Sequence, residues 1–322
     1  MAPSPLLEIR NLNVEFSARK RVIRALRNVN LKIPKGGIVG VVGESGCGKS
    51  TLILSIMRLL ASNARVTGGE VMFGGRNLLA ISEREMQSVR GNEISMIFQD
   101  PLTSLNPVIS IGQQLIDVQY RDATSRQEKK QRAIEALAQV GIPDANTRMT
   151  SYPHQFSGGM RQRIAIAMTM IEQPTLLIAD EPTTALDATL EVQIIRELKG
   201  LQQQYQCSIL FVSHHLGVVA DLCDYVVVMY AGEIVEQGPV RDLFHDVRHP
   251  YAQKLLECDP ARIVRSKEKM FPTIPGDLPD LGNLPSGCIF CDRCHRSLDE
   301  CATKPPSLKQ VSPDHFVSCH LY

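Results

Sequence analysis

The sequence has almost no net charge and no long apolar run. Its 35 lysine and arginine residues nearly balance 34 aspartate and glutamate residues, which leaves a formal charge of +1. This balance gives no overall electrostatic field that would attract nucleic acid or an acidic membrane. No apolar stretch approaches the roughly 20 residues that a membrane-spanning helix needs. Residues 1–5 lack the basic and then apolar pattern of a signal peptide. We therefore expect a cytoplasmic protein that reaches a membrane only through a partner.

The chain length and the cysteine distribution suggest a large domain with an appendage. The 322 residues are sufficient for that arrangement or for two domains. Five of the nine cysteines crowd the last 35 residues, at Cys288, Cys291, Cys294, Cys301 and Cys319. In a reducing cytoplasm, such a group favours metal binding over disulfide formation.

A glycine-rich stretch follows an apolar run near the start of the chain. Residues 38–42 read Ile-Val-Gly-Val-Val, and a further apolar segment begins at Leu52. This is the strand–turn–helix context of a phosphate-binding loop, in which glycines let backbone N–H groups point at phosphate oxygens. The helix that follows adds its positive end. The predicted loop comprises Gly43, Glu44, Ser45, Gly46, Cys47, Gly48, Lys49, Ser50 and Thr51.

Two residues of this loop have specific chemical roles. Lys49 can reach the terminal phosphates of a nucleotide, and the Ser50 hydroxyl can bind Mg²⁺. Before the loop, residues 6–36 alternate apolar and polar side chains, which predicts half-buried antiparallel strands. Phe16 on one of them is either a core side chain or a platform for an adenine ring, and the sequence leaves both open. Residues 68–75 predict another short strand.

The middle of the chain predicts a buried strand followed by a helical block. The strand at residues 94–98 ends at Gln99, where a side chain can sense a ligand beside the sheet or simply enter a surface loop at 100–107. Residues 108–170 have helical spacing, with a capping box at Ser125. This block predicts a helical subdomain inserted between strands of the sheet.

The helical block contains a second candidate for phosphate binding. Ser157 precedes Gly158 and Gly159 at the start of an apolar helix, so it can cap that helix while the glycines expose backbone N–H groups. A single nucleotide seldom needs two helix N-termini from one chain. The pattern therefore indicates a second site or a second subunit.

Two later strands end in polar residues that suit catalysis. Residues 176–179 are apolar and predict a strand of a parallel sheet, and they are followed by Asp180 and Glu181. Adjacent strand residues point to opposite faces, so Asp180 suits Mg²⁺ while Glu181 suits activation of a water. The strand at 208–212 leads to His214, a candidate phosphate contact at the edge where open α/β sheets bind ligands. The fold class is α/β.

Taken in order, these motifs resemble the nucleotide-binding subunit of an ABC transporter. The order is the phosphate loop, Gln99, residues 156–159, Asp180-Glu181, Ala185-Leu186-Asp187 and His214, over residues 6 to about 240. Phe156 and Met160 depart from the usual ends of the family's Leu-Ser-Gly-Gly-Gln signature, but its Ser-Gly-Gly centre is present. The resemblance implies a P-loop NTPase core at 1–240, with an antiparallel β subdomain and a helical subdomain at about 105–170.

The resemblance also implies the site chemistry. ATP binds with Mg²⁺, which Ser50, Gln99 and Asp180 would contact, and Asp187 belongs to the nucleotide site. Glu181 polarises the attacking water, and His214 contacts the γ-phosphate. A head-to-tail dimer, usually with a sister ATPase, places Ser157, Gly158 and Gly159 on the nucleotide of the other subunit.

A narrower resemblance is to the dipeptide, oligopeptide and nickel importer ATPases. It rests on residues 98–107, Arg248-His249-Pro250-Tyr251 and Ile274-Pro275-Gly276. It implies import of di- or oligopeptides, with nickel chelates or another small solute as the alternative. The implied partners are two transmembrane permease subunits and an extracytoplasmic binding protein. The chain would lie at the cytoplasmic face of the inner membrane and bind no nucleic acid.

The C-terminal extension at 241–322 is rich in proline and predicts a loop-rich segment that a metal would stabilise. Cys288, Cys294, Cys301 and Cys319 have the spacing seen in the family's [4Fe–4S] form, in which four thiolates satisfy the cluster. Cys291 is surplus, so the choice of ligands is less secure. The alternatives are free thiols or structural zinc, held by four cysteines or by three with a histidine. The candidate histidines are His295, His315 and His320.

Two other classes of function remain as alternatives. A non-transport ABC ATPase of translation or DNA repair usually carries two cassettes or a long coiled coil, and this sequence has neither. A metal-sensing module with a vestigial ATPase would have lost catalytic residues, whereas here the set is complete.

Overall fold

The computed structural model describes residues 4–18, 21–99, 104–184, 186–259 and 272–322. The chain divides into two compact units, called unit 1 (Met1–Ser82 with Leu210–Tyr322) and unit 2 (Glu83–Ile209). Part of the loop expected at 100–107, namely residues 100–103, lies outside the described residues, as does Ala185.

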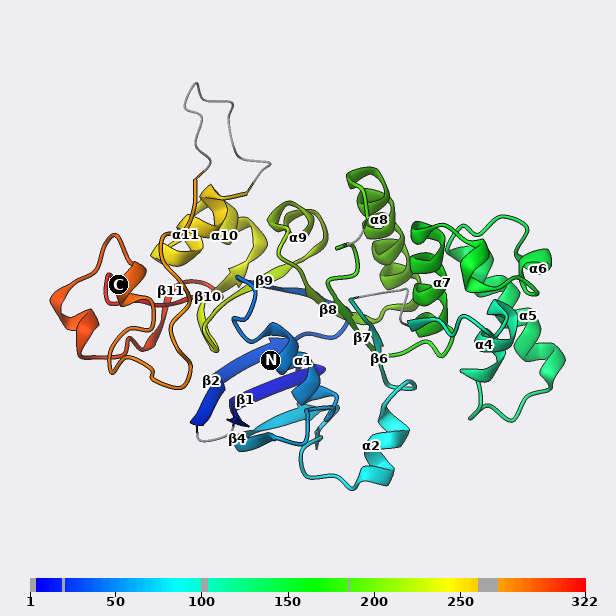
Figure 1. Cartoon of the computed structure of the whole chain (residues 1–322), viewed down its shortest axis with the longest axis horizontal. Coiled ribbons are helices and arrows are strands. Elements are labelled where there is room, and N and C mark those ends of the chain that lie inside the picture. Colours follow the sequence, from blue (N-terminus) through cyan, green and yellow to red (C-terminus); the bar gives the residue numbers. More distant parts are fainter. Residues whose placement is uncertain (1–3, 19–20, 100–103, 185, 260–271) are drawn as a thin grey trace. The chain divides into compact units, whose positions relative to one another are not determined.

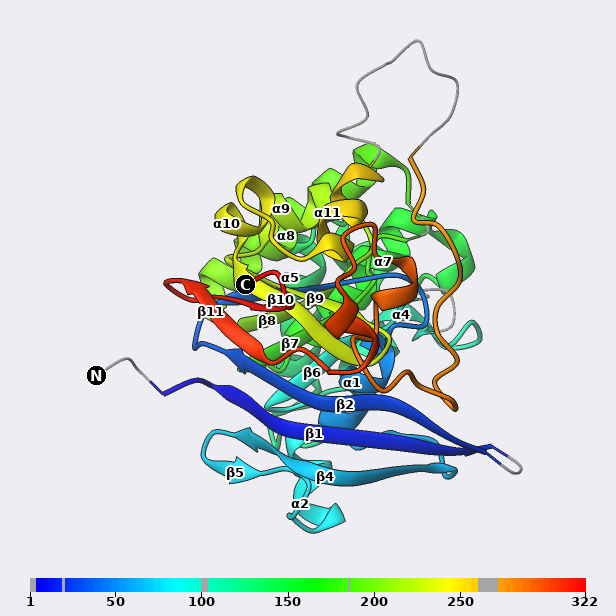
Figure 2. The same ribbon diagram turned by 90° about the vertical axis from the view of Figure 1, so that its left-hand side faces the viewer.

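Unit 1 begins with an antiparallel sheet, seen in Figure 2. Its strands, in the order β2-β1-β4-β5, are β1 (Leu7–Ala18), β2 (Arg21–Ile33), β4 (Ala64–Phe73) and β5 (Arg76–Asn77). Along β1, Leu7, Ile9, Leu12 and Val14 are buried while the residues between them are partly or fully exposed. The alternation at residues 6–36 therefore correctly predicted half-buried antiparallel strands. The strand expected at 68–75 begins earlier, at Ala64.

A second sheet in unit 1 carries the phosphate loop. Strand β3 (Ile38–Val42) pairs in parallel with β9 (Tyr225–Tyr230), which pairs antiparallel with β10 (Glu233–Pro239). All five residues of β3 are buried, as expected for an apolar strand with both faces covered. The helices of unit 1 are α1 (Lys49–Ile56), α9 (Leu216–Leu222), α10 (Val240–His245) and α11 (Pro250–Glu257).

The C-terminal extension adds two strands that the sequence did not predict. Strands β11 (Leu308–Ser312) and β12 (His315–Ser318) form an antiparallel pair, and β12 also pairs with β10. Only two residues of β12 are buried, His315 and Val317. Such a short alternation, close to several prolines, is too weak a signal to identify a strand. Apart from these strands and two helices near its start, the described part of the extension is loop, with short 3-10 turns at Cys291–Arg293 and Asp299–Ala302.

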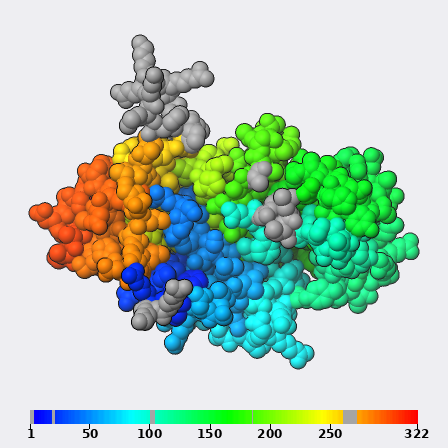
Figure 3. Space-filling model, viewed as in Figure 1, coloured from blue at the N-terminus to red at the C-terminus, as the bar shows by residue number. Residues whose placement is uncertain are grey.

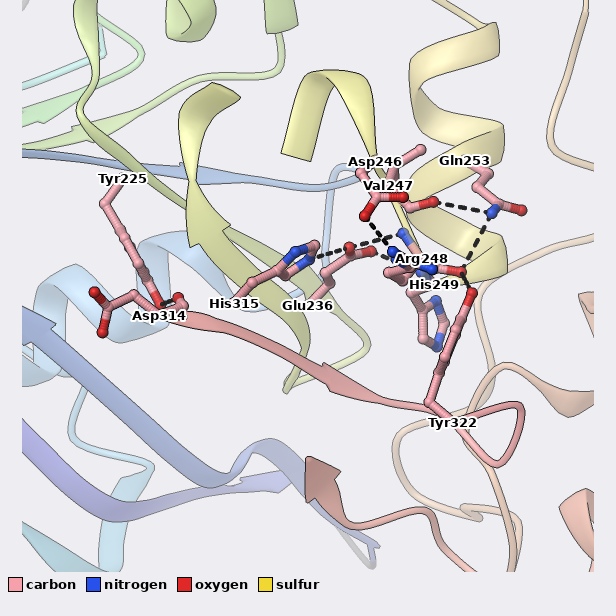
Figure 4. Close-up of polar contacts among 10 residues, drawn as sticks. All are labelled: Tyr225, Glu236, Asp246, Val247, Arg248, His249, Gln253, Asp314, His315 and Tyr322. Atoms are coloured by element: carbon pink, nitrogen blue, oxygen red, sulfur yellow. Dashed lines mark hydrogen bonds and ion pairs between the residues drawn. The ribbon is translucent and has the colours of Figure 1, made fainter. Parts of the chain in front are cut away.

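A buried carboxylate joins the extension to this sheet (Figure 4). Glu236 on β10 is 0% exposed, and its Oε1 lies 2.7 Å from His315 Nε2 on β12. The backbone N–H groups of Arg248 and His249 donate to the same carboxylate at 2.8 and 2.7 Å. Because a buried charge is costly unless it is hydrogen-bonded, this network fixes β12 and the start of α11 to β10.

Two tyrosine hydroxyls make further contacts, one between β9 and the extension and one within the extension. The Tyr225 hydroxyl donates to the Asp314 carbonyl at 2.9 Å, and the Tyr322 hydroxyl lies 3.4 Å from the Arg248 carbonyl (Figure 4). In the space-filling view of Figure 3, orange residues of the extension lie against blue residues from the first part of the chain. The extension is therefore part of unit 1 rather than a separate body.

Unit 2 contains two parallel strands and a block of helices (Figure 1). Strands β6 (Ile94–Ile97) and β7 (Leu176–Asp180) are fully buried and pair in parallel, with Ile94 opposite Leu176. Strand β6 ends at Ile97, one residue earlier than predicted, and Phe98 after it is 48% exposed. The helices are α2 (Glu83–Val89), α4 (Ile111–Asp117), α5 (Arg126–Gln139), α6 (Ala145–Arg148), α7 (Gly158–Met170) and α8 (Ala188–Tyr205).

The predicted helical block at 108–170 is confirmed, including the start of α5. The Ser125 hydroxyl accepts from Glu128 N–H at 3.2 Å, and the Glu128 carboxylate accepts from Ser125 N–H at 2.8 Å. This reciprocal capping box satisfies two backbone donors that helix geometry leaves unpaired. No helix among the described residues has both the length and the apolar character to cross a membrane.

Candidate functional site

The predicted phosphate loop connects β3 to α1. Gly43, Gly46 and Gly48 have φ of +152°, +83° and +109°, a region that favours glycine. A Cβ at Gly43 would lie 2.2 Å from the Met229 carbonyl oxygen, so no side chain fits there. The tight backbone turn expected from the glycines is therefore present at the start of α1.

Lys49 lies within this turn and is only 6% exposed. Its Nζ donates to the carbonyl oxygens of Gly43 at 2.7 Å and Glu44 at 3.1 Å. Its charge is thus held at the loop, where a phosphate group would need it. Cys47 beside it is fully buried, and burial raises the pKa of its thiol, so Cys47 contributes packing rather than charge. Ser50 is exposed in the first turn of α1.

Two further predicted residues belong to unit 1. Phe16 on β1 is half-buried, so part of its ring remains accessible. His214 follows β8 (Ser208–Val212) and is exposed, with its ring 4.3 Å from that of His215. The Ser213 N–H donates to the Val41 carbonyl at 3.2 Å, which fixes the end of β8 beside β3.

In unit 2, the structure brings Gln99 and Glu181 together. Glu181 follows β7 and has φ of +46°, an uncommon and strained conformation for a residue with a side chain. Its Oε2 accepts from Gln99 Nε2 at 3.2 Å and from Thr184 Oγ1 at 2.9 Å. Asp180, the last residue of β7, is 9% exposed. Thr184 was not identified from the sequence, although it lies only three residues after Glu181.

The remaining predicted residues of unit 2 lie at helix starts. Ser157 caps α7, as expected, and its hydroxyl accepts from Met160 N–H at 3.4 Å. A Cβ at Gly158 would meet open space, whereas one at Gly159 would lie 3.1 Å from Leu190 Cδ1. Asp187 caps α8 by accepting from the backbone N–H groups of Thr189 and Leu190, both at 3.0 Å. This structural role of Asp187 was missed, although an aspartate before a helix is a usual capping signal.

The four cysteines that were predicted to bind the iron–sulfur cluster also lie in unit 1. Cys288, Cys301 and Cys319 are buried, and Cys294 is partly exposed. Burial, with a smaller contribution from the nearby thiols of Cys301, Cys319 and Cys294, raises the pKa of Cys288 to about 12. The four thiols therefore lie within electrostatic range of one another. Yet in the part of the chain that the structure describes, no group of three or more His, Cys, Asp or Glu side chains is placed to hold a metal ion.

The surplus cysteine and two candidate histidines have other partners. Cys291 Sγ lies 3.2 Å from Ser297 Oγ. His315 is buried against Glu236, and His320 Nε2 lies 2.8 Å from the Lys304 carbonyl oxygen. His315 is thus committed to the sheet network, which argues against its use as a zinc ligand.

Sequence reasoning missed the contacts between the extension and the phosphate loop. The Glu44 N–H donates to the Tyr251 hydroxyl at 2.9 Å, and the Arg293 guanidinium pairs with the Glu44 carboxylate. These partners are 207 and 249 positions from Glu44, respectively. No local pattern joins residues so distant in sequence.

Comparisons with known proteins agree with this geometry. The sequence matches the family described as ABC transporter over residues 26–184, and the one described as oligopeptide/dipeptide transporter, C-terminal region, over 235–301. It is 46% identical to the dipeptide transport ATP-binding protein DppD of Lactococcus lactis subsp. cremoris, over 100% of this chain and 92% of that protein. It is 45% identical to the oligopeptide transport ATP-binding protein OppD of Bacillus subtilis, over 98% of this chain and 88% of that protein.

A solved structure supports the fold. The dimeric ATP-binding cassette MJ0796, bound to ADP and Pi, matches with a TM-score of 0.65 and 28% identity, over 73% of this chain and 99% of that one. The predicted P-loop NTPase core is therefore confirmed. With nearly full-length relatives well above 30% identity, the chain belongs to the family of ABC transporter ATP-binding proteins.

Proposed function

We propose that the chain is the ATP-hydrolysing subunit of an importer that moves di- or oligopeptides across the cytoplasmic membrane. The observation that carries this proposal is the combination of an intact phosphate loop with a C-terminal region of the oligopeptide/dipeptide transporter type. Near full-length likeness to dipeptide and oligopeptide transport proteins supports the same substrate class. The same machinery importing nickel chelates or another small solute is the alternative.

The substrate is ATP with Mg²⁺. Residues 43–51 would bind the phosphates, and Phe16 would stack on the adenine. Lys49 would contact the terminal phosphates, and His214 the γ-phosphate. Ser50, Gln99 and Asp180 would contact Mg²⁺ directly or through water. The hydrogen bonds from Lys49 Nζ to the loop carbonyls hold its charge at the loop, which supports phosphate binding there.

Glu181 would act on the attacking water. Its carboxylate is oriented by two donors on one oxygen, Gln99 Nε2 and Thr184 Oγ1. A carboxylate fixed in this way can accept a hydrogen bond from water and draw away its proton as the water attacks the γ-phosphate.

We further propose an assembly with partners. An ATPase domain at 1–240, with a helical subdomain at about 105–170, would be followed by the extension at 241–322. The two family matches, which end at 184 and begin at 235, support this division. Ser157, Gly158 and Gly159 would bind the nucleotide of a sister ATPase, with Asp187 close to the same site. Two permease subunits and an extracytoplasmic binding protein would complete an importer that holds this chain at the cytoplasmic face of the membrane.

Reconstitution tests the transport proposal. The chain is expressed with neighbouring permease and ATPase genes, purified as a complex and placed in proteoliposomes with a binding protein. We expect ATP hydrolysis to rise when a dipeptide or an oligopeptide is supplied, and labelled peptide to accumulate in the lumen. Stimulation by a nickel chelate alone would favour the alternative solute. ATP turnover that is indifferent to permeases and to every solute would contradict a transport role.

We also propose that the extension holds a [4Fe–4S] cluster through Cys288, Cys294, Cys301 and Cys319. The mutual proximity of these four thiols supports it, although they are not arranged as a metal site in the described structure. Four thiolates are the donor set that such a cluster takes, and bound metal would stabilise a loop-rich segment.

Iron and sulfide assays on protein purified without oxygen test this proposal. We expect about four iron atoms and about four sulfide ions per chain, with an absorbance band at roughly 400 nm. Cys319→Ser should lose the cluster, whereas Cys291→Ser should keep it. Stoichiometric zinc with no sulfide would show that the extension holds structural zinc and no cluster. An equal loss of iron in both variants would contradict the assignment of the four ligands.

A further inference from the structure

Arg293 of the extension pairs with Glu44 of the phosphate loop through two hydrogen bonds. Arg293 Nη1 donates to Glu44 Oε2 at 2.8 Å, and Nη2 donates to Oε1 at 3.0 Å. The side chains are 6% and 28% exposed, respectively. A bidentate, charge-assisted pair with this degree of shielding is stronger and more specific in geometry than an ion pair at the surface.

The guanidinium of Arg293 is itself held in place. Its Nε donates to the Pro275 carbonyl at 2.7 Å, and Nη2 also reaches the Ile274 carbonyl at 3.3 Å. Nη1 lies 3.3 Å from the Tyr230 hydroxyl. Because these partners come from β9 and from the segment after residue 272, the orientation of Arg293 is set before any nucleotide binds.

The extension also contacts the loop through an aromatic cluster. The ring of Phe290 lies 5.1 Å from that of Tyr230 and 5.4 Å from that of Tyr251. The Tyr251 hydroxyl in turn accepts a hydrogen bond from the Glu44 N–H. Both the backbone and the side chain of Glu44 are therefore fixed by residues of the C-terminal part of the chain.

Glu44 places a negative charge in a loop proposed to bind a polyanion. Glu44 is the only acidic residue in the loop at 43–51. An unpaired carboxylate there would repel phosphate, and it could turn toward the backbone N–H groups of the loop and occupy the place of a phosphate oxygen. Pairing with Arg293 cancels this charge and holds the carboxylate toward the extension.

We infer that Arg293 is a positioning residue for ATP, which keeps the phosphate loop open to the nucleotide by neutralising and orienting Glu44. This inference deepens the proposed function and rests on ATP binding at residues 43–51. It predicts an effect on ATP affinity rather than on the chemical step, because Arg293 acts through Glu44 and not on the γ-phosphate.

Equilibrium binding of a fluorescent ATP analogue, mant-ATP, to the full chain tests the inference. We expect Arg293→Gln to raise the Kd by on the order of tenfold, the size of one lost charge-assisted interaction. Arg293→Lys, which keeps the charge without the bidentate geometry, should give a smaller increase. The kcat at saturating ATP, measured in the assembled complex, should change little, while KM rises with the Kd. Arg296→Gln removes the same charge from an exposed position in the extension and should bind mant-ATP like the original chain.

Removal of the Glu44 charge separates neutralisation from simple damage to the extension. Glu44→Gln alone should bind mant-ATP at least as tightly as the original chain, a result that does not depend on the folding of any Arg293 variant. The double variant Glu44→Gln/Arg293→Gln should recover that affinity. Persistent weak binding in the double variant, weaker binding in Glu44→Gln, or unchanged binding in Arg293→Gln would each overturn the inference. Failure of the original chain to bind mant-ATP would instead contradict the proposed nucleotide site.

Discussion

Gln99 Nε2 donates a hydrogen bond to Glu181 Oε2 at 3.2 Å, although the two residues are 82 positions apart in the sequence. They come together because β6 and β7 pair in parallel, so that the two strands end at the same edge of the sheet. A contact between the candidate sensor of bound ligand and the candidate activator of water is thus a direct consequence of strand pairing in unit 2. It also orients the carboxylate on which the proposed chemistry depends.

Replacing Glu181 by glutamine should nearly abolish ATP hydrolysis while preserving ATP binding. An amide has the shape of the carboxylate but cannot accept the proton of the attacking water, so we expect kcat to fall by about 100-fold or more. Steady-state ATPase assays on the assembled complex, together with mant-ATP binding, measure the two effects. Glu135→Gln, on the exposed side of α5, is the matched control and should hydrolyse ATP normally. Normal turnover in the Glu181 variant would contradict the assigned role.

Stability should depend on pH through His249. This residue is buried at the start of α11, and burial lowers its pKa from the ordinary 6.5 to about 3. Below pH 6.5 the unfolded chain binds a proton that the folded chain does not accept until about pH 3. The contribution of His249 to the free energy of unfolding is therefore complete above pH 6.5 and falls with pH in that window, by up to about 1.4 kcal/mol per unit.

His249→Asn should flatten this slope, because asparagine does not titrate and can still cap α11. Urea unfolding at about pH 7 and at about pH 5 measures the difference in the free energy of unfolding. The exposed residue His245 provides the control, and His245→Asn should leave the slope nearly unchanged. Equal slopes in the original chain and the His249 variant would show that His249 does not control this pH dependence.

The capping box of α5 should contribute measurably to the stability of unit 2. Ser125→Ala removes the acceptor of Glu128 N–H and the partner of its carboxylate, so we expect a loss of about 1 kcal/mol. Glu128→Ala removes the carboxylate that accepts from the Ser125 N–H and hydroxyl, but it keeps the hydroxyl as the acceptor of the backbone N–H at position 128, so it should cost less. The double variant should be less destabilised than the sum of the two single losses, since both residues act in one motif. Strict additivity in thermal or urea unfolding would argue that the two bonds act independently.

Gly287 should be intolerant of a side chain. A Cβ there would lie 2.1 Å from the Cys301 carbonyl oxygen and 2.6 Å from the Ala302 carbonyl carbon, both backbone atoms that cannot move cheaply. Gly287→Ala should therefore loosen the fold of the extension and speed its cleavage by a protease at low concentration. Gly217→Ala, where a Cβ meets nothing within 4 Å, is the control. Identical cleavage of the two variants would contradict the close packing at Gly287.

The sequence predicted features that depend on short stretches of residues better than features that depend on contacts between distant residues. Strands at 38–42 and 208–212 were identified with the observed limits, because continuous apolar runs bounded by turns are strong local signals. The capping roles of Ser125 and Ser157 were likewise found from local patterns. Gln99 and Glu181 were both identified, but their contact depends on the pairing of strands and could not be derived locally.

Features set by distant contacts were missed. The pairing of Arg293 with Glu44 crosses 249 positions, and no periodicity or motif records it. Strand β12 is defined by its pairing with β11 and β10 rather than by its own short alternation. The cysteine spacing led to the prediction of four cluster ligands, but spacing does not fix the geometry that a metal requires, and no such site is formed among the described residues.

The pairing of β10 with β12 has a consequence for biosynthesis. Glu236 and His315 are separated by 79 positions, so a ribosome completes β10 well before it adds the histidine that pairs with Glu236. At ordinary elongation rates this delay lasts roughly 4 to 16 s. A β10 that folds during this interval has an unpaired edge, and its Glu236 carboxylate has only the backbone N–H groups of Arg248 and His249 as partners. Because a charged side chain at an unpaired edge disfavours pairing with another strand, Glu236 would protect that edge until its own partner is made.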